Sequence, residues 1–212
     1  MLSKKNLITL GALSVVALVM VAFIATNLIR GYRKKVEDNR VAVVVADATA
    51  ELRKALGAGP SADSAAKLDE LARIAQNSPN AAAGSAAEAY LLGAREIVRR
   101  RVEGERLARE AAAARNALAG HMNRSASRNS AWIRNAAELK RRVEASHADL
   151  GRALKTLDDL LSGLPDSEKR LAPHVAASAL LETGEIDAAR ARAQDESKRA
   201  AAELEKARRI TP

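Results

Sequence analysis

A long uncharged stretch near the start of the chain is followed by segments in which apolar residues recur at helical spacing. Residues 7–29 read LITLGALSVVALVMVAFIATNLI, without one charged side chain. A helix rises about 1.5 Å per residue, so this stretch would extend roughly 34 Å, against about 30 Å for the hydrocarbon core of a bilayer. The pattern predicts a transmembrane helix at 7–29, preceded by a short basic tail at 1–6.

A cleaved signal peptide is the alternative for this stretch. The apolar core of a signal peptide is usually about 7–15 residues long, which is shorter than 7–29. Cleavage after Ala25 would also place Phe23 where a small side chain is needed. The flanking residues are typical of an uncleaved anchor, and they comprise Lys4, Lys5, Arg30, Tyr32, Arg33, Lys34 and Lys35.

Such an anchor predicts a single-pass protein of the bacterial inner membrane. Basic residues after the span favour a cytoplasmic C-terminal domain, because positive charge is retained on the cytoplasmic side. A short basic tail directly before the span instead favours a signal anchor, which places that domain in the periplasm. We favour the periplasmic side, and we expect the lipid bilayer and other membrane-complex proteins as partners.

After the anchor, the sequence predicts a juxtamembrane helix and linker at 30–60 and a helical region at 61–128. Glycine and proline in Gly57-Ala-Gly-Pro60 break the chain. A new helix capped by Ser61 or Ser64 follows, with an apolar face of Leu68, Leu71, Ala72 and Ala75. After a turn at 78–80, a long helix at 81–122 has a stripe of Tyr90 or Leu91, Ala94, Val98, Val102, Leu107, Ala111, Ala114 and Leu118.

The clearest heptad pattern lies in the predicted helical hairpin at 129–212, whose first helix we expect to be capped by Ser130. Two mainly apolar series repeat every seven residues and are offset by three, as in the seam of a coiled coil. Gly163 and Pro165 are expected to end this helix. The seam consists of Leu139, Val143, Leu150, Leu157, Leu160 and Leu164.

Another helix must cover this seam, because one amphipathic helix cannot bury its own apolar stripe. The short connection at 162–167 favours an antiparallel hairpin with the following helix. An intermolecular coiled coil, and hence a homo-oligomer, is the alternative. The predicted fold is all-α, with one N-terminal transmembrane helix followed by an elongated helical bundle or antiparallel coiled-coil hairpin. Small residues would face the seam at Ala176, Ala179, Ala189 and Ala193.

The composition supports the all-α class. Of the 212 residues, 48% are hydrophobic but only 2% are aromatic, whereas aromatic side chains dominate burial in most compact cores. The net charge of +9 suggests an anionic partner. However, residues 1–35 contain six basic and no acidic side chains, so most of the excess flanks the predicted anchor. Cysteine is absent, which excludes disulfides and thiol chemistry.

No residue pattern predicts catalysis, and we expect neither an enzyme nor a cofactor. His121, His147 and His174 are far apart in the sequence, unlike the i, i+4 pair of a helical metal site, so no metal site is expected. We expect these histidines to be solvated or to lie between helices. Gly57-Ala-Gly-Pro60 lacks the Lys-Ser/Thr of a phosphate-binding loop.

A basic segment at 95–128 includes Arg99, Arg100 and Arg101, which could contact phosphates or lipid head groups. Aromatic residues that would stack on nucleic-acid bases are absent from it. Several of its arginines have a glutamate four residues later, as on solvated helices. The segment predicts a solvated helix or a face for an acidic partner, and nucleic acid is not an expected partner.

Residues 177–189 resemble the middle of a tetratricopeptide repeat. Ala177, Gly184, Ile186 and Ala189 occupy positions where this motif has small, turn, large and small residues. The layout of one span followed by a helical domain is similar to that of periplasmic ancillary subunits of the bacterial secretion translocon. The resemblance implies an adaptor that binds peptides or unfolded chains. The residue patterns themselves predict a membrane-anchored scaffolding protein, an accessory subunit of a bacterial envelope complex.

Overall fold

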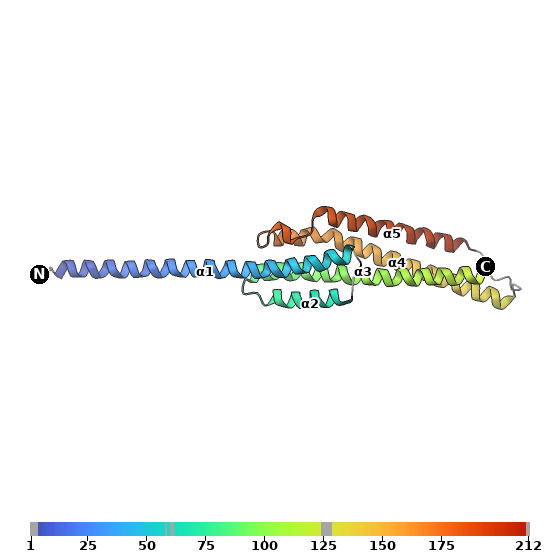
Figure 1. The fold of residues 1–212 in the computed structure, drawn as a ribbon, viewed down its shortest axis with the longest axis horizontal. Coiled ribbons are helices and arrows are strands. Elements are labelled where there is room, and N and C mark those ends of the chain that lie inside the picture. The colour runs from blue at the N-terminus through green and yellow to red at the C-terminus, as the bar shows by residue number, and fades with distance from the viewer. Residues whose placement is uncertain (1–3, 58, 60–61, 124–128, 211–212) are drawn as a thin grey trace.

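In the computed structural model, the described residues form five α-helices and one short 3-10 helix in an elongated arrangement (Figure 1). The structure describes residues 4–57, 59, 62–123 and 129–210, and the side chains of these residues except 4–19, 33, 37, 38 and 62. These described residues contain no strand, so the all-α prediction is confirmed. The elements are α1 Lys4–Gly57, α2 Ala62–Gln76, α3 Ala81–Met122, α4 Ser130–Leu171, η1 Ala177–Ala179 and α5 Thr183–Arg209.

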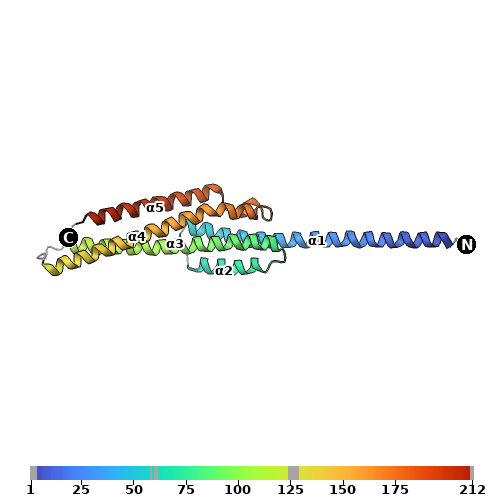
Figure 2. The ribbon, with the colours of Figure 1, turned by 180° about the vertical axis from the view of Figure 1, so that it is seen from behind.

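Helices α1, α3 and α5 run in one direction, and α2 and α4 run in the other (Figures 1 and 2). Helix α4 packs along both α3 and α5, whereas α2 packs against α3 and α1. We call the end that contains α1 and α2 the proximal half (residues 41–98 and 156–189). The other end is built from α3, α4 and α5 only, and we call it the distal half (residues 99–122, 130–155 and 190–209).

The main hydrophobic core lies in the proximal half. Tyr90 on α3 is completely buried there, and its hydroxyl lies 2.9 Å from the Thr49 hydroxyl on α1. Leu157 and Leu161 on α4 belong to the same core, so that α1, α3 and α4 share it. A smaller cluster around Val143 holds the distal half together. The bundle is therefore best packed where α1 takes part.

The membrane assignment of residues 7–29 is not supported. Helix α1 covers this stretch, but within the part of the chain that the structure describes no helix is both long and apolar enough to cross a membrane. The predicted inner-membrane localisation, with a periplasmic C-terminal domain, is therefore contradicted.

The residues predicted to flank a membrane lie on the part of α1 that extends beyond the bundle (Figure 1). Arg30, Tyr32, Lys34 and Lys35 are exposed there. The side chains of Lys4, Lys5 and Arg33 lie outside the described residues.

The middle of the chain follows the sequence prediction closely. Helix α3 has the predicted bounds, and the Asn80 side chain caps it by accepting a hydrogen bond from the amide of Ala83 at 3.3 Å. All residues of the predicted α2 face are buried, as is the predicted α3 stripe except the half-buried Val102. Ser64 lies within α2, and Ser61 lies outside the described residues.

The predicted end of the seam helix is wrong. Helix α4 continues through Gly163 and Pro165 to Leu171, and the connection to α5 lies at 172–182. A proline inside a helix costs about 3 kcal/mol or more, because the bond to the carbonyl four residues earlier is lost. Burial of Leu164 and Leu171, which are 2% and 0% exposed, offsets this cost, since a buried leucine contributes about 1.5–3 kcal/mol. The start of α4 also differs by one residue, because Asn129 caps it instead of Ser130.

The seam is covered by helices of the same chain, and its residues are not equally buried. Val143, Leu157 and Leu164 are buried, whereas Leu139, Leu150 and Leu160 are half-buried. The predicted packing against the following helix is confirmed, and α4 packs against α3 as well. Of the alanines expected opposite the seam, Ala189 and Ala193 are buried on α5, while Ala176 and Ala179 lie before it in the connection.

The segment that resembles a tetratricopeptide repeat does not form a pair of helices. Residues Ala177–Ala179 form a 3-10 turn, and α5 begins only at Thr183. A capping box between Glu182 and Glu185 starts this helix. The turn residues of the motif therefore mark the beginning of one long helix.

Two glycines of α3 differ in a way that predicts opposite effects of alanine. A Cβ at Gly84 would lie 2.8 Å from the carbonyl oxygen of Ala75 and 3.0 Å from Cβ of Ser78, whereas a Cβ at Gly93 would have nothing within 4 Å. We expect Gly84→Ala to lower the free energy of unfolding by about 1–3 kcal/mol, because α2 must move away. We expect Gly93→Ala to raise it by up to about 1 kcal/mol, through helix propensity alone. Urea denaturation measures both, and equal effects would contradict the close approach of α2 and α3.

Candidate functional site: a groove between α3 and α5

Helix α1 ends halfway along the bundle, and its neighbours continue without it (Figure 1). At this end the carbonyl of Leu56 accepts a hydrogen bond from Arg192 on α5 at 3.2 Å. Gly59 then adopts a φ of +103°, which favours glycine, beside the carboxylate of Glu105 on α3. From Glu105 to Met122, α3 continues for about another 25 Å. No described helix occupies the position of α1 along this part.

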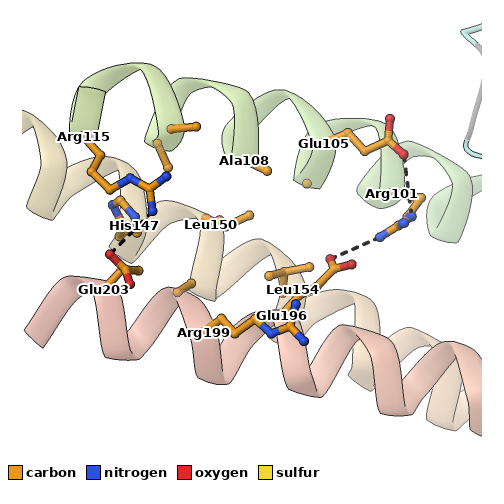
Figure 3. Close-up of a pocket in the computed structure, with 14 residues that line it drawn as sticks. Arg101, Glu105, Ala108, Arg115, His147, Leu150, Leu154, Glu196, Arg199 and Glu203 are labelled. Carbon is orange, nitrogen blue, oxygen red and sulfur yellow. Dashed lines mark hydrogen bonds and ion pairs between the residues drawn. The ribbon is translucent and has the colours of Figure 1, made fainter. Parts of the chain in front are cut away.

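A groove opens between α3 and α5 in the distal half (Figure 3). Alanines line its walls, among them Ala108, Ala111 and Ala112 on α3 and Ala200 on α5. The floor comes from α4, which contributes His147, Leu150 and Leu154. This part of the groove has a volume of about 310 Å³. Its surface is mainly apolar, with charged side chains along both rims.

A second hollow of about 370 Å³ continues the groove toward the end of the bundle. The two hollows share Arg115 and Glu203, which lie at their junction. The second hollow is lined by Leu118, Ala119, Met122, Val143, Ala207 and Ile210 among others. Along α3 the combined groove extends from Arg101 to Met122, a rise of about 32 Å. We refer to the two hollows together as the distal groove.

Ion pairs bridge the distal groove, with arginine on α3 and glutamate on α5. Arg101 Nη1 lies 3.3 Å from Glu196 Oε2, and its Nε lies 3.9 Å from Glu105 Oε1. Arg115 Nη1 lies 3.7 Å from Glu203 Oε2. Partly exposed pairs of this kind contribute only about 0–1 kcal/mol each. They can therefore open when another charged group enters the groove.

Glu203 is held mainly by its own helix. Lys206 Nζ donates to Glu203 Oε1 at 2.7 Å, and this bond lowers the pKa of the Glu203 carboxyl below its ordinary value, with further lowering by Arg115 and His147. Glu203 is therefore ionised at neutral pH and keeps a cation beside it without Arg115. The guanidinium of Arg115 is the member of this cluster that can turn toward a ligand.

His147 is the one polar side chain among the described residues of the groove floor. Only 6% of it is exposed, and its Nδ1 lies 2.9 Å from the carbonyl oxygen of Val143 one turn earlier. No described residue bonds to its other ring nitrogen, and the ring lies beside Arg115 and Glu203 (Figure 3). The expectation that this histidine lies between helices is confirmed. Sequence reasoning did not connect it with a groove.

The arginine triplet does not form one face, because successive helical residues point about 100° apart. Arg99 lies 3.5 Å from Asp69 on α2, Arg100 pairs with Glu96 and Glu103 of its own helix, and Arg101 reaches α5. Only Arg101 belongs to the distal groove. That these arginines contact a partner remains a prediction.

The other histidines lie apart from this groove. His121 stacks on Trp132 with ring centroids 4.9 Å apart, and its Nε2 lies 3.1 Å from the carbonyl oxygen of Trp132. His174 lies in the connection before α5. Among the described residues, no three histidine or acidic side chains are placed to hold a metal ion.

Sequence reasoning missed the distal groove, although two signals for it are present. Ala108, Ala111 and Ala112 give α3 a wide small-residue surface, and Arg101 and Arg115 are two heptads apart on its edge. An open, straight groove lined by small residues suits an α-helix better than a compact ligand, because small side chains let two helix axes approach closely. Comparison of the chain with models of protein families, with curated proteins and with solved structures found no match.

Proposed function

We propose that this chain is an α-helical interaction protein, a scaffolding subunit whose distal groove binds a helix of a partner protein. The observation that carries the proposal is that α1 ends at Gly57 while α3, α4 and α5 continue, which leaves the fourth place of the bundle empty. The membrane anchor expected from the sequence is not part of this proposal.

The packing of α1 supports a helix as the ligand. In the proximal half α1 buries Val45, Leu52 and Ala55 against the same bundle, and Arg53 pairs with Glu185 on α5 at 2.6 Å. The distal groove lies beyond the end of α1, because Glu105 of α3 both lines the groove and lies beside Gly59, which follows α1. A partner helix placed there would continue the line of α1.

The apolar side chains of the groove provide the surface that such a helix would cover. Leu150 is half-buried although it occupies the middle of the seam, and Ala108 is exposed. Each CH₂ group that is removed from water contributes about 0.8 kcal/mol. A helix of about 21 residues would match the length of roughly 32 Å. Covering these side chains is the expected driving force for binding.

The test uses the absence of cysteine from the chain. A nitroxide label on Ala108→Cys reports on the groove, and a label on the exposed Ala66→Cys of α2 serves as the control. The probes are three 21-residue amphipathic helical peptides with the same leucine and alanine face, whose flanks are acidic, uncharged or basic. We expect at least one peptide to immobilise the label at position 108 but not the label at position 66, as measured by electron paramagnetic resonance.

A groove-filling variant completes the test. Ala112 is half-buried on the groove wall, so Ala112→Trp would fill the groove without entering the main core. We expect this variant to keep its helical circular dichroism and to lose peptide binding. If none of the three peptides immobilises the label at position 108, the proposed function is wrong.

A further inference from the structure

The charges of the molecule are separated between its two halves. The distal half has nineteen basic and ten acidic residues, whereas the proximal half has seven basic and fourteen acidic residues. Each of the three distal helix segments contributes a net charge of +3. The third segment is separated from the other two by residues 156–189, and the fold brings the charges of all three together around the distal groove.

We infer that the partner helix in the distal groove is acidic, with its carboxylates facing Arg115 and Arg199. This inference rests on the proposed function and adds the chemistry of the partner. A basic field around a groove attracts an anionic ligand and raises its association rate.

The glutamates on the groove rims already have cations beside them. Glu196 pairs with Arg101, and Glu203 keeps Lys206 at 2.7 Å. Arg199 on α5 also lines the groove and is exposed, but it has no ion pair with any described residue (Figure 3). Its guanidinium is therefore available to a carboxylate of a partner.

Arg115 provides the second cation. Its distance of 3.7 Å from Glu203 is longer than that of a good charge-assisted hydrogen bond, which is about 2.7–2.9 Å. A carboxylate that enters the groove can bind Arg115 while Glu203 remains bound to Lys206. The exchange leaves no rim charge without a partner. An arriving lysine or arginine would instead meet Arg115 and Arg199 directly.

Nucleic acid is the competing anion. Its recognition in single-stranded form uses aromatic side chains on which bases stack, and none of the described groove-lining residues is phenylalanine, tyrosine or tryptophan. The alanine and leucine surface would stay uncovered against a phosphate backbone, whereas the apolar face of a helix would bury it. The combination of an apolar floor with basic rims therefore favours an acidic amphipathic helix.

The test compares the acidic and basic peptides described above on the full chain. We expect the acidic peptide to bind about tenfold or more tightly than the basic one at about 50 mM salt. The difference should shrink at about 500 mM salt, because exposed charges are then screened. Fluorescence anisotropy gives both dissociation constants, and the label at position 108 shows that binding occurs in the groove.

Two charge-reversal variants test whether the preference for the acidic peptide comes from the groove. Arg199→Glu should weaken the acidic peptide severalfold and tighten the basic one. Arg73→Glu changes the net charge equally but lies exposed on α2 in the proximal half, and it should leave both affinities nearly unchanged. Circular dichroism checks that both variants remain folded.

The outcomes separate the inference from the proposed function. If the uncharged or basic peptide binds in the groove as tightly as the acidic one, the inference is wrong and the proposed function stands. If no peptide reaches the groove, the proposed function fails as well. If a 20-base-pair DNA duplex binds more tightly than the acidic peptide and leaves the label at position 108 mobile, the basic residues of the distal half bind nucleic acid outside the groove. The inference is then overturned.

Discussion

Replacing both Leu157 and Leu161 with alanine is expected to unfold the protein or to lower its melting temperature sharply. These side chains are 2% and 0% exposed and lie in the core that α1, α3 and α4 share. Truncating one buried leucine costs about 2–5 kcal/mol, whereas a whole domain has a stability of about 5–15 kcal/mol. Thermal and urea denaturation, followed by circular dichroism, measure the loss.

Leu150→Ala is the matched control for this prediction. Leu150 belongs to the same heptad series as Leu157, but it is half-buried on the floor of the distal groove. Its truncation should therefore cost much less stability than that of Leu157 and should weaken peptide binding in the groove. If Leu150→Ala destabilises the protein as much as Leu157→Ala does, the distal half is more closely packed than the structure shows.

Tyr90→Phe is expected to lower the free energy of unfolding by about 1–3 kcal/mol, the cost of leaving a buried polar group without its partner. The partner is the Thr49 hydroxyl, which is 2.9 Å away and belongs to a residue that is 1% exposed. Adding Thr49→Val removes the second polar group. The double variant should therefore lose less stability than the sum of the two single variants, as urea denaturation of all four proteins would show.

The same tyrosine predicts a loss of stability at alkaline pH. Burial raises the pKa of the Tyr90 hydroxyl from 10.0 to about 12, although the Thr49 bond opposes this shift. Between these two pH values the unfolded chain releases the proton while the folded chain retains it, so unfolding becomes more favourable as the pH rises. A difference of about two pKa units corresponds to roughly 2–3 kcal/mol.

The stability difference between the wild type and Tyr90→Phe should therefore narrow as the pH rises from about 10 to about 12, because only the wild type carries this ionisable group. Stability below pH 10 should not depend on Tyr90 ionisation. A constant difference across this interval would show that Tyr90 ionises equally easily in the folded and unfolded chains.

Much of the helical architecture could be predicted from local sequence. The bounds of α3 follow from Asn80, which caps its first turn, and from apolar residues that recur at helical spacing. The face of α2 follows from Leu68 and Leu71 in the same way. Caps and amphipathic spacing act within a few residues of one helix, so the sequence contains them directly.

Other features depended on contacts between distant segments. Pro165 is a helix breaker by local rules, but α4 continues because Leu164 directly before it and Leu171 after it are buried. Leu150 and Leu157 are equivalent in the heptad pattern, yet the first is half-buried and the second is buried. Leu157 belongs to the main core to which α1 contributes, whereas Leu150 lies on the floor of the distal groove.

The helical fold, the bounds of α3 and the buried faces of α2 and α3 could be predicted from the sequence alone. Two features follow only from the tertiary structure: the described helices leave the fourth position of the bundle unoccupied in the distal half, and this half is basic while the other is acidic. Helix formation depends mainly on residues that are close together in the sequence. A groove and a local charge excess depend on where α1 ends relative to α3, α4 and α5, and on which residues the fold brings together there.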